Sequence, residues 1–244
     1  MNIFNVGFLG STVLAGDFNP ESESGLIAWY DANDVTTIDK DGSDLVSEWR
    51  NKVVDDAFTV TQATAGNKPT WVLEGQNGKD TIRYAAQDFL QSGAFTDVDQ
   101  PLTIFWASKI PTASASNIRE FMRNVSGTTI QIGVNDGTDD KILSQMDSDS
   151  MLTGSIIGIE ETWRQIKLLM NGASSSIFVD GVSQATGSQG TKKFEQFNFS
   201  SADSQGSWVG DFGEVLIYDE VVSAADITDI EVYLQAKWAT PALP

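Results

Sequence analysis

Short runs of apolar residues, separated by turn-forming residues, dominate the sequence from residue 25 onwards. Residues 102–107 read Leu-Thr-Ile-Phe-Trp-Ala and are strongly apolar, as in a central strand of a β-sandwich. Residues 129–134 alternate between polar and apolar positions, so their apolar side chains share one face of a strand. Residues 176–184 form two short runs on either side of Asp180 and Gly181, a pair that favours a hairpin turn. The pattern predicts an all-β fold.

The last third of the chain combines two strands with a helix. Residues 163–170 and 208–218 are predicted strands. In the second strand we expect one face to carry Trp208, Phe212, Leu216 and Tyr218, and the other to carry Val209, Val215 and Ile217. Beyond it, Ser223 has the features of a helix N-cap, with Asp226 three positions on. Apolar residues then recur at helical spacing, before Pro241 prevents continuation: Ile227, Ile230, Leu234 and Trp238. We therefore expect a short C-terminal helix that packs on the sandwich.

The N-terminal residues differ from the rest of the chain. Residues 1–18 are rich in glycine and apolar side chains but contain no Lys or Arg, and Gly7 and Gly10 interrupt the apolar run. This composition fits neither a signal peptide nor a transmembrane helix. We expect residues 1–24 to be an arm and linker, and residues 25–240 to form one domain. The arm either packs on its own domain or binds a partner through Phe4, Phe8 and Leu9.

The composition narrows the partners and the chemistry. Hydrophobic residues make up 41% of the 244 residues, enough for a substantial core, and the formal net charge is −19. Such a surface repels phosphate backbones and anionic lipids, so we expect neither nucleic-acid binding nor membrane insertion. The chain has no Cys and no His. Thiol nucleophiles, disulfides, Ser-His-Asp relays and imidazole-ligated zinc are therefore excluded.

A set of segments, strongest near the two ends of the domain, is recognisable in the sequence: residues 25–34, 46–52, 177–181, 210–219 and 230–238. Together these segments resemble laminin-G-like domains of the concanavalin A-like lectin/glucanase superfamily. It implies a jelly-roll of two antiparallel sheets packed face to face, closed by a short C-terminal helix. It does not imply one activity, because this fold carries lectins, enzymes and structural modules.

Members of this superfamily that hydrolyse sugars carry the motif Glu-x-Asp-x-x-Glu on one strand, and this sequence lacks it. Glu214 and Asp219 lie an odd number of residues apart and so do not offer two carboxylates on one face. The polysaccharide lyases of the superfamily use His and Tyr, and the chain has no His. We therefore expect no catalytic residues and no enzymatic activity.

Calcium is the one cofactor that the sequence brings into consideration. Asp136, Asp139 and Asp140 lie in one glycine-containing loop, and Asp31 and Asp34 flank the end of an early strand. Carboxylate oxygens suit a hard cation such as Ca²⁺. Asp residues also favour turns through their own backbone hydrogen bonds, so a loop without a bound metal is the alternative.

The seven Trp residues separate into two groups. Five lie inside apolar patterns and are expected in the core: Trp29, Trp49, Trp106, Trp208 and Trp238. Trp71 and Trp163 stand at the starts of strands, where partial exposure would let their rings stack on a sugar. These two are the candidate ligand-binding residues, with burial as the alternative.

Two functional hypotheses follow. In the first, the chain is a non-catalytic structural or adhesive protein on a virion surface, such as a capsid decoration or fibre protein, and its arm contacts other structural proteins. In the second, it is a lectin-like carbohydrate-binding module, with or without calcium, that acts outside the cell or at a cell surface.

Overall fold

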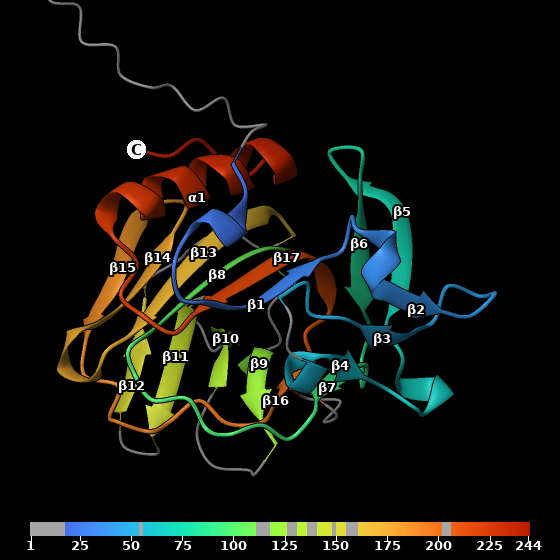
Figure 1. Cartoon of the computed structure of the whole chain (residues 1–244), viewed down its shortest axis with the longest axis horizontal. Helices are drawn as coiled ribbons and strands as arrows, with labels where there is room; N and C mark the ends of the chain where they lie inside the picture. The colour runs from blue at the N-terminus through green and yellow to red at the C-terminus, as the bar shows by residue number, and fades with distance from the viewer. Residues whose placement is uncertain are drawn as a thin grey trace, which may run out of the picture.

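The computed structural model describes residues 18–53, 56–110, 118–125, 131–135, 141–147, 150–154, 161–201 and 206–244. Within these ranges the chain folds into two antiparallel β-sheets and one α-helix near the C-terminus (Figure 1). The all-β sandwich expected from the sequence is confirmed. No helix in the described ranges is long and apolar enough to cross a membrane.

Sheet A has eight strands. Seven follow the order β15-β14-β13-β8-β17-β6-β5, and β1 pairs with β17 beside this path. Its strands are β1 (Leu26–Asp31), β5 (Thr70–Gln76), β6 (Lys79–Tyr84), β8 (Leu102–Lys109), β13 (Trp163–Met170), β14 (Ser175–Val179), β15 (Val182–Gly187) and β17 (Gly210–Tyr218).

Sheet B has nine strands in the order β12-β11-β10-β9-β16-β7-β4-β3-β2. They are β2 (Ile38–Lys40), β3 (Val46–Trp49), β4 (Val60–Thr61), β7 (Leu90–Ser92), β9 (Ile118–Asn124), β10 (Gln131–Asn135), β11 (Lys141–Asp147), β12 (Ser150–Thr153) and β16 (Phe197–Phe199). Short 3-10 helices connect strands: η1 (Pro20–Ser22), η2 (Val35–Thr37), η3 (Asp56–Phe58), η4 (Ala65–Asn67) and η5 (Gly172–Ser174).

Most strands predicted from the pattern are present. The predicted strand 163–170 coincides with β13, and the predicted hairpin is β14 and β15 joined at Asp180 and Gly181. Both turn residues have positive φ angles, of 48° and 75°, which the twist of a two-residue hairpin requires. The run at 102–107 becomes the fully buried strand β8, which lies between β13 and β17.

The faces predicted for the last strand are partly wrong. The register shifts between Phe212 and Glu214, which indicates a β-bulge. Because a bulge changes the alternation of side chains, Phe212 faces sheet B and stacks on Phe121 at 4.6 Å, whereas Tyr218 faces the other way, towards Pro20. Phe212 therefore does not share a face with Tyr218. The strand also begins at Gly210, two residues later than predicted.

The core between the sheets is rich in aromatic rings. Trp106 of sheet A stacks on Phe121 of sheet B with ring centroids 4.4 Å apart, and Trp49 and Phe199 pack nearby. All five Trp residues expected in the core are buried: Trp29, Trp49, Trp106, Trp208 and Trp238. Aromatic contacts of this density contribute much of the stability of a β-sandwich.

Helix α1 (Ala224–Trp238) covers the outer face of sheet A (Figure 1). Ser223 caps it as predicted, because its hydroxyl accepts a hydrogen bond from the backbone N–H of Asp226 at 3.3 Å. The predicted apolar stripe is confirmed at its core positions, with Ile230, Leu234 and Trp238 fully buried. Sheet A is thus covered on both faces, while sheet B has no helix on its outer face within the described residues.

Candidate functional site

A continuous row of polar residues crosses the outer face of sheet B. The strand registers place one residue from each of eight neighbouring strands opposite the next. From β2 to β11 these residues, which we call the polar row, are Asp39, Glu48, Thr61, Gln91, Asn198, Arg123, Gln131 and Gln145. All eight are at least partly exposed.

The alternation of side chains along each strand produces this row. The residues beside it in sequence point into the core and are buried, for example Trp49, Val60, Leu90, Phe199 and Ile132. Strands in a sheet lie about 4.8 Å apart, so eight strands give a row about 34 Å long. The polar row therefore offers hydrogen-bonding groups at regular intervals along a line perpendicular to the strands.

Neighbouring groups hold the centre of the polar row in place. The carboxylate of Glu120 is 3% exposed and accepts hydrogen bonds from the side-chain amide of Gln131 and, at 3.3 Å, from Nη1 of Arg123. Burial and fixed partners limit the rotamers of these side chains, which lowers the entropic cost of binding. Beside them, Oδ1 of Asn198 is buried and has no hydrogen-bond partner among the described residues.

The β2 end of the polar row is acidic, and one arginine partly neutralises it. Nη1 of Arg50 lies 2.5 Å from Glu48 and 3.1 Å from Asp39. The guanidinium thus lies between the two carboxylates and orients both. The remaining members of the row are one Arg, one Thr and four amides, which together supply both donors and acceptors. This set of groups suits a ligand rich in hydroxyls.

The two Trp residues proposed from the sequence do not belong to this face. Trp71 and Trp163 are both partly exposed, as expected. Trp71 lies in β5, at the edge of sheet A, with Nζ of Lys40 4.2 Å from its ring centroid. Trp163 lies on the outer face of sheet A and stacks on Trp238 of α1 at 5.6 Å, with the rings 6° from parallel. The structure does not bring the two rings together, and their ligand-binding role stays a prediction.

The other proposed site residues lie outside the described residues. They are Phe4, Phe8 and Leu9 of the arm and Asp136, Asp139 and Asp140 of the calcium loop. In the described part of the chain, no group of three or more His, Cys, Asp or Glu residues is arranged to hold a metal ion. The calcium hypothesis for the loop therefore stays a prediction.

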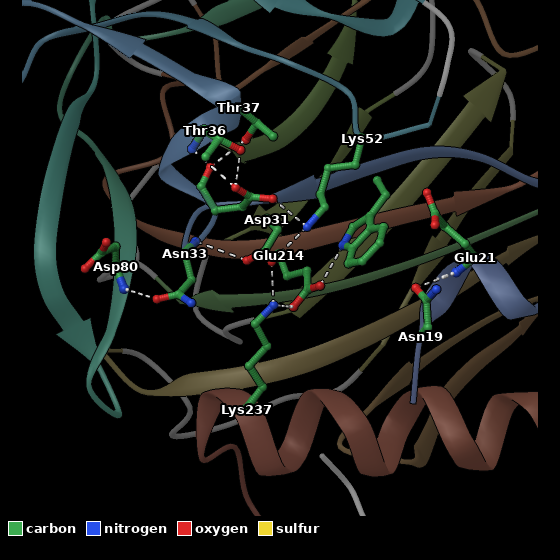
Figure 2. A network of polar contacts seen from close by, with 12 residues as sticks. Asn19, Glu21, Asp31, Asn33, Thr36, Thr37, Lys52, Asp80, Glu214 and Lys237 are labelled. Carbon is green, nitrogen blue, oxygen red and sulfur yellow. Dashed lines mark hydrogen bonds and ion pairs between the residues drawn. The ribbon is translucent and has the colours of Figure 1, made fainter. Parts of the chain in front are cut away.

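Asp31 and Asp34 both form ion pairs with lysines. Nζ of Lys52 lies 2.8 Å from Asp34 and 3.6 Å from Asp31, and Nζ of Lys237 lies 2.8 Å from Asp31 (Figure 2). The lysines supply the positive charge that a cation would otherwise provide. The role of these two aspartates as calcium ligands stays a prediction.

Glu214 is the centre of this buried network and has no contact with solvent. One of its oxygens accepts hydrogen bonds from Nε1 of Trp29 and the hydroxyl of Tyr233, both at 2.7 Å. The other accepts from Nε1 of Trp238 and Nζ of Lys237, both at 2.8 Å. Burial raises the pKa of Glu214, and the charge of Lys237 opposes this shift.

The network joins three elements of the fold. Figure 2 shows Lys237 reaching up from α1 and Lys52 approaching from the opposite side, with Asp31 and Glu214 between them. Because Glu214 is fully buried and all its contacts are to the protein, it cannot reach a sugar. We conclude that this carboxylate holds β1, β17 and α1 together.

The sequence contains a weak signal for the polar row. Gln131 and Asn198 each stand between two apolar residues, in Ile-Gln-Ile and Phe-Asn-Phe. Gln91 follows Leu90 in the same manner. Such isolated amides identify the outer face of a strand, but only the pairing of the strands shows that they form one line.

No family model matches the sequence, and no curated protein sequence matches it. Solved structures do resemble the fold. Domain 4 of AbnA, an extracellular arabinanase from Geobacillus stearothermophilus, in complex with arabinotriose, matches with a TM-score of 0.59 and 14% identity, over 84% of this chain and 98% of that domain. The binding domain of Paraclostridial Mosquitocidal Protein 1 matches with a TM-score of 0.60 and 12% identity, over 91% of this chain and 56% of that one.

The third structure is a larger enzyme. Trypanosoma rangeli sialidase in complex with the inhibitor DANA matches with a TM-score of 0.57 and 10% identity, over 87% of this chain but only 33% of the sialidase chain. The present chain thus spans about one third of that enzyme. At these identities the matches show a shared fold and nothing further. The chain has the β-sandwich fold found in carbohydrate-binding and glycosidase-associated domains.

Proposed function

We propose that this protein is a non-catalytic, lectin-like carbohydrate-binding module, and that it binds a neutral glycan along the polar row of sheet B. The polar row is the observation that carries the proposal. Its amide, guanidinium and hydroxyl groups match the alternating donors and acceptors of sugar hydroxyls. The resemblance of the sequence to laminin-G-like domains supports the same function.

The comparisons support this hypothesis better than the virion-surface hypothesis. One of the similar domains is described in complex with arabinotriose, and another is described as a binding domain. The similar structures reported above do not support a role in a virus particle, which stays a prediction from the sequence. The net charge of −19 favours neutral glycans over sulfated or uronic acid polymers, because like charges repel.

The proposal that binding occurs without catalysis rests on the carboxylates. Among the described residues of the polar row, Asp39 and Glu48 are held by Arg50, and Glu120 beside it is buried under amide and guanidinium donors. Most glycosidases use two carboxylates that flank one glycosidic bond. We accordingly expect binding of glycans without hydrolysis, at a cell surface or outside the cell.

A glycan array with the full-length chain tests the proposal, followed by titration of the best ligand. The array is run with Ca²⁺ and with a chelator, which also tests the predicted calcium loop. Gln91→Ala and Asn198→Ala should each weaken binding about 5-fold, because one neutral hydrogen bond contributes about 1 kcal/mol. Gln184→Ala is the matched control, since this side chain lies on β15 of sheet A and bonds only to the nearby carbonyl of Val182.

Three results would contradict the proposal. An array that remains silent with and without calcium would remove glycan binding altogether. Full affinity in both the Gln91 and Asn198 variants would move the site away from the polar row. Release of free sugar from a bound oligosaccharide would show that the protein is an enzyme.

A further inference from the structure

A groove opens beside β1, where two loops from the other sheet approach this strand. Its volume is about 830 Å³, which lies within the usual range of ligand sites. The lining comes from β1, Val53, η3, the loop at 94–98 and the residue that follows β17. It consists of Leu26, Ile27, Val53, Ala57, Phe58, Ala94, Phe95, Thr96, Val98 and Asp219. We call this the β1 groove. It shares no residue with the polar row.

Apolar side chains form the floor and walls of the β1 groove. Eleven hydrophobic residues of the described chain are only partly buried against the core, and five of them line this groove: Leu26, Ile27, Val53, Phe95 and Val98. Phe95 stacks on the buried ring of Phe58 at 4.4 Å, so it is fixed in place. A concentration of half-exposed apolar side chains at one place, supported from below, is typical of a binding surface.

Acidic side chains lie at this groove and beside it. Asp219 lines the groove itself. A second hollow of about 350 Å³ adjoins it through Leu26 and Val53, and is also lined by Glu21 and Glu23. No Lys or Arg lines either hollow among the described residues.

The acidic charge near Glu23 is not neutralised within the groove. Burial raises the pKa of Glu23, and the nearby carboxylate of Asp226 raises it further. A positively charged group placed in the second hollow would relieve this repulsion. The groove therefore combines an apolar cleft with an acidic edge that lacks a basic partner in its lining.

We propose that the β1 groove is a docking site for a peptide segment of another protein, with an apolar anchor residue flanked by Lys or Arg. The apolar anchor would occupy the cleft between Phe95 and Leu26, and the basic residues would lie against Glu23 and Asp219. This inference goes beyond glycan binding and concerns a different surface. The arm of this chain complements the groove poorly, because residues 1–17 contain no Lys or Arg.

The test measures binding of fluorescein-labelled hexapeptides to the full-length chain by anisotropy. The probe is Lys-Lys-Phe-Leu-Lys-Lys, and the two control peptides are Glu-Glu-Phe-Leu-Glu-Glu and Lys-Lys-Ser-Ser-Lys-Lys. We expect the probe to bind at least about tenfold more tightly than either control, since the site requires both the anchor and the charge. Added salt should weaken the binding, as it does for exposed charge pairs.

Variants locate the site. Val53→Lys places a cation in the groove and should lower the affinity for the probe about tenfold. Val35→Lys, at a valine of η2 that is 50% exposed, should leave this affinity unchanged. Glu23→Gln, a smaller change, should weaken binding about threefold. Thermal melting of each variant checks that the fold is retained.

Several outcomes would overturn the inference. Equal binding of the two lysine-rich peptides would show that only net charge is sensed. Equal effects of Val53→Lys and Val35→Lys, with Glu23→Gln unchanged, would place binding elsewhere. Binding that appears only in the variant Phe4→Ser/Phe8→Ser/Leu9→Ser would assign the groove to the arm of the chain itself. The glycan array is unaffected by any of these results, so the two proposals fail independently.

Discussion

Replacing Lys237 with Met tests whether the buried network holds α1 on the sandwich. The change keeps the length of the side chain but removes its charge. Nζ of Lys237 lies 2.8 Å from a carboxylate oxygen of Asp31 and 2.8 Å from one of Glu214. The three side chains are only 13%, 9% and 0% exposed. In Lys237→Met the carboxylate of Glu214 would remain buried beside an uncharged side chain, and Asp31 would keep only its longer contact of 3.6 Å with Lys52 among the ion pairs of the described residues.

The expected cost follows from this burial. Breaking a buried ion pair by removing one partner costs about 3–5 kcal/mol, because the remaining charge is not compensated. Lys193 is a matched control: it pairs with Asp99 at 3.0 Å, but the two side chains are 50% and 76% exposed. Water screens that pair, so Lys193→Met should cost less than about 1 kcal/mol.

The pH dependence provides a second measurement. The pKa of Glu214 is raised by burial, so protonation of this group favours the folded state over the unfolded chain. Without Lys237 its pKa should rise further. The loss in free energy of unfolding of Lys237→Met relative to the wild type should therefore be largest near pH 7 and decrease as the pH falls towards about 5.

Urea unfolding followed by tryptophan fluorescence gives the free energy of unfolding of each protein at both pH values. The double variant Lys237→Met/Glu214→Gln should recover part of the loss, since it removes one of the uncompensated charges. The reasoning would be refuted if Lys237→Met lost no more stability than Lys193→Met, or if its deficit grew at lower pH.

Three further predictions concern the stability of the fold. Gly213→Ala should lower the free energy of unfolding in urea by about 1–3 kcal/mol, because the added Cβ would lie 2.7 Å from the ring of Trp238. The control Gly66→Ala has open space around it and should lower this free energy by less than about 1 kcal/mol. Equal losses in the two variants would contradict this reasoning. Ser223→Ala removes the N-cap of α1 and should lower the free energy of unfolding by about 1 kcal/mol in the same urea experiment. An unchanged free energy of unfolding would show that the cap does not stabilise the helix. Burial raises the pKa of Asp34, but hydrogen bonds from Lys52 and Thr36 lower it, and the overall shift is downward. The ionised Asp34 therefore stabilises the fold above the pKa that this group has in the unfolded chain, and this stabilisation is lost on acidification. The wild type should therefore lose more stability than Asp34→Asn as the pH falls below about 4, and parallel pH curves would exclude the effect.

The elements of the fold were predictable because their signals are local. The apolar run at 102–107 and the period of three to four from Ile227 to Trp238 each depend on neighbouring residues only. The structure places these segments in β8 and α1. Composition likewise excluded thiol and imidazole chemistry, because it requires no knowledge of contacts.

The candidate site was not predictable in this manner. The polar row exists because strands that are distant in sequence pair in one register, such as β16 with β7 and β9. A single sequence does not contain that register. The bulge before Glu214 had the same effect on a smaller scale, since one extra residue moved Phe212 to the face opposite Tyr218. Aromatic residues drew attention to Trp71 and Trp163, while the aligned amides stood out only after folding.

The arrangement of the polar row also bears on how recognition can change over evolutionary time. Each of its positions belongs to a different strand, and each side chain points away from the buried residues that stabilise that strand. A substitution at one position can thus alter one contact along a ligand while the hydrophobic interior stays intact. A surface built in this modular manner can acquire a new preference through single, nearly independent replacements, with the scaffold conserved beneath it.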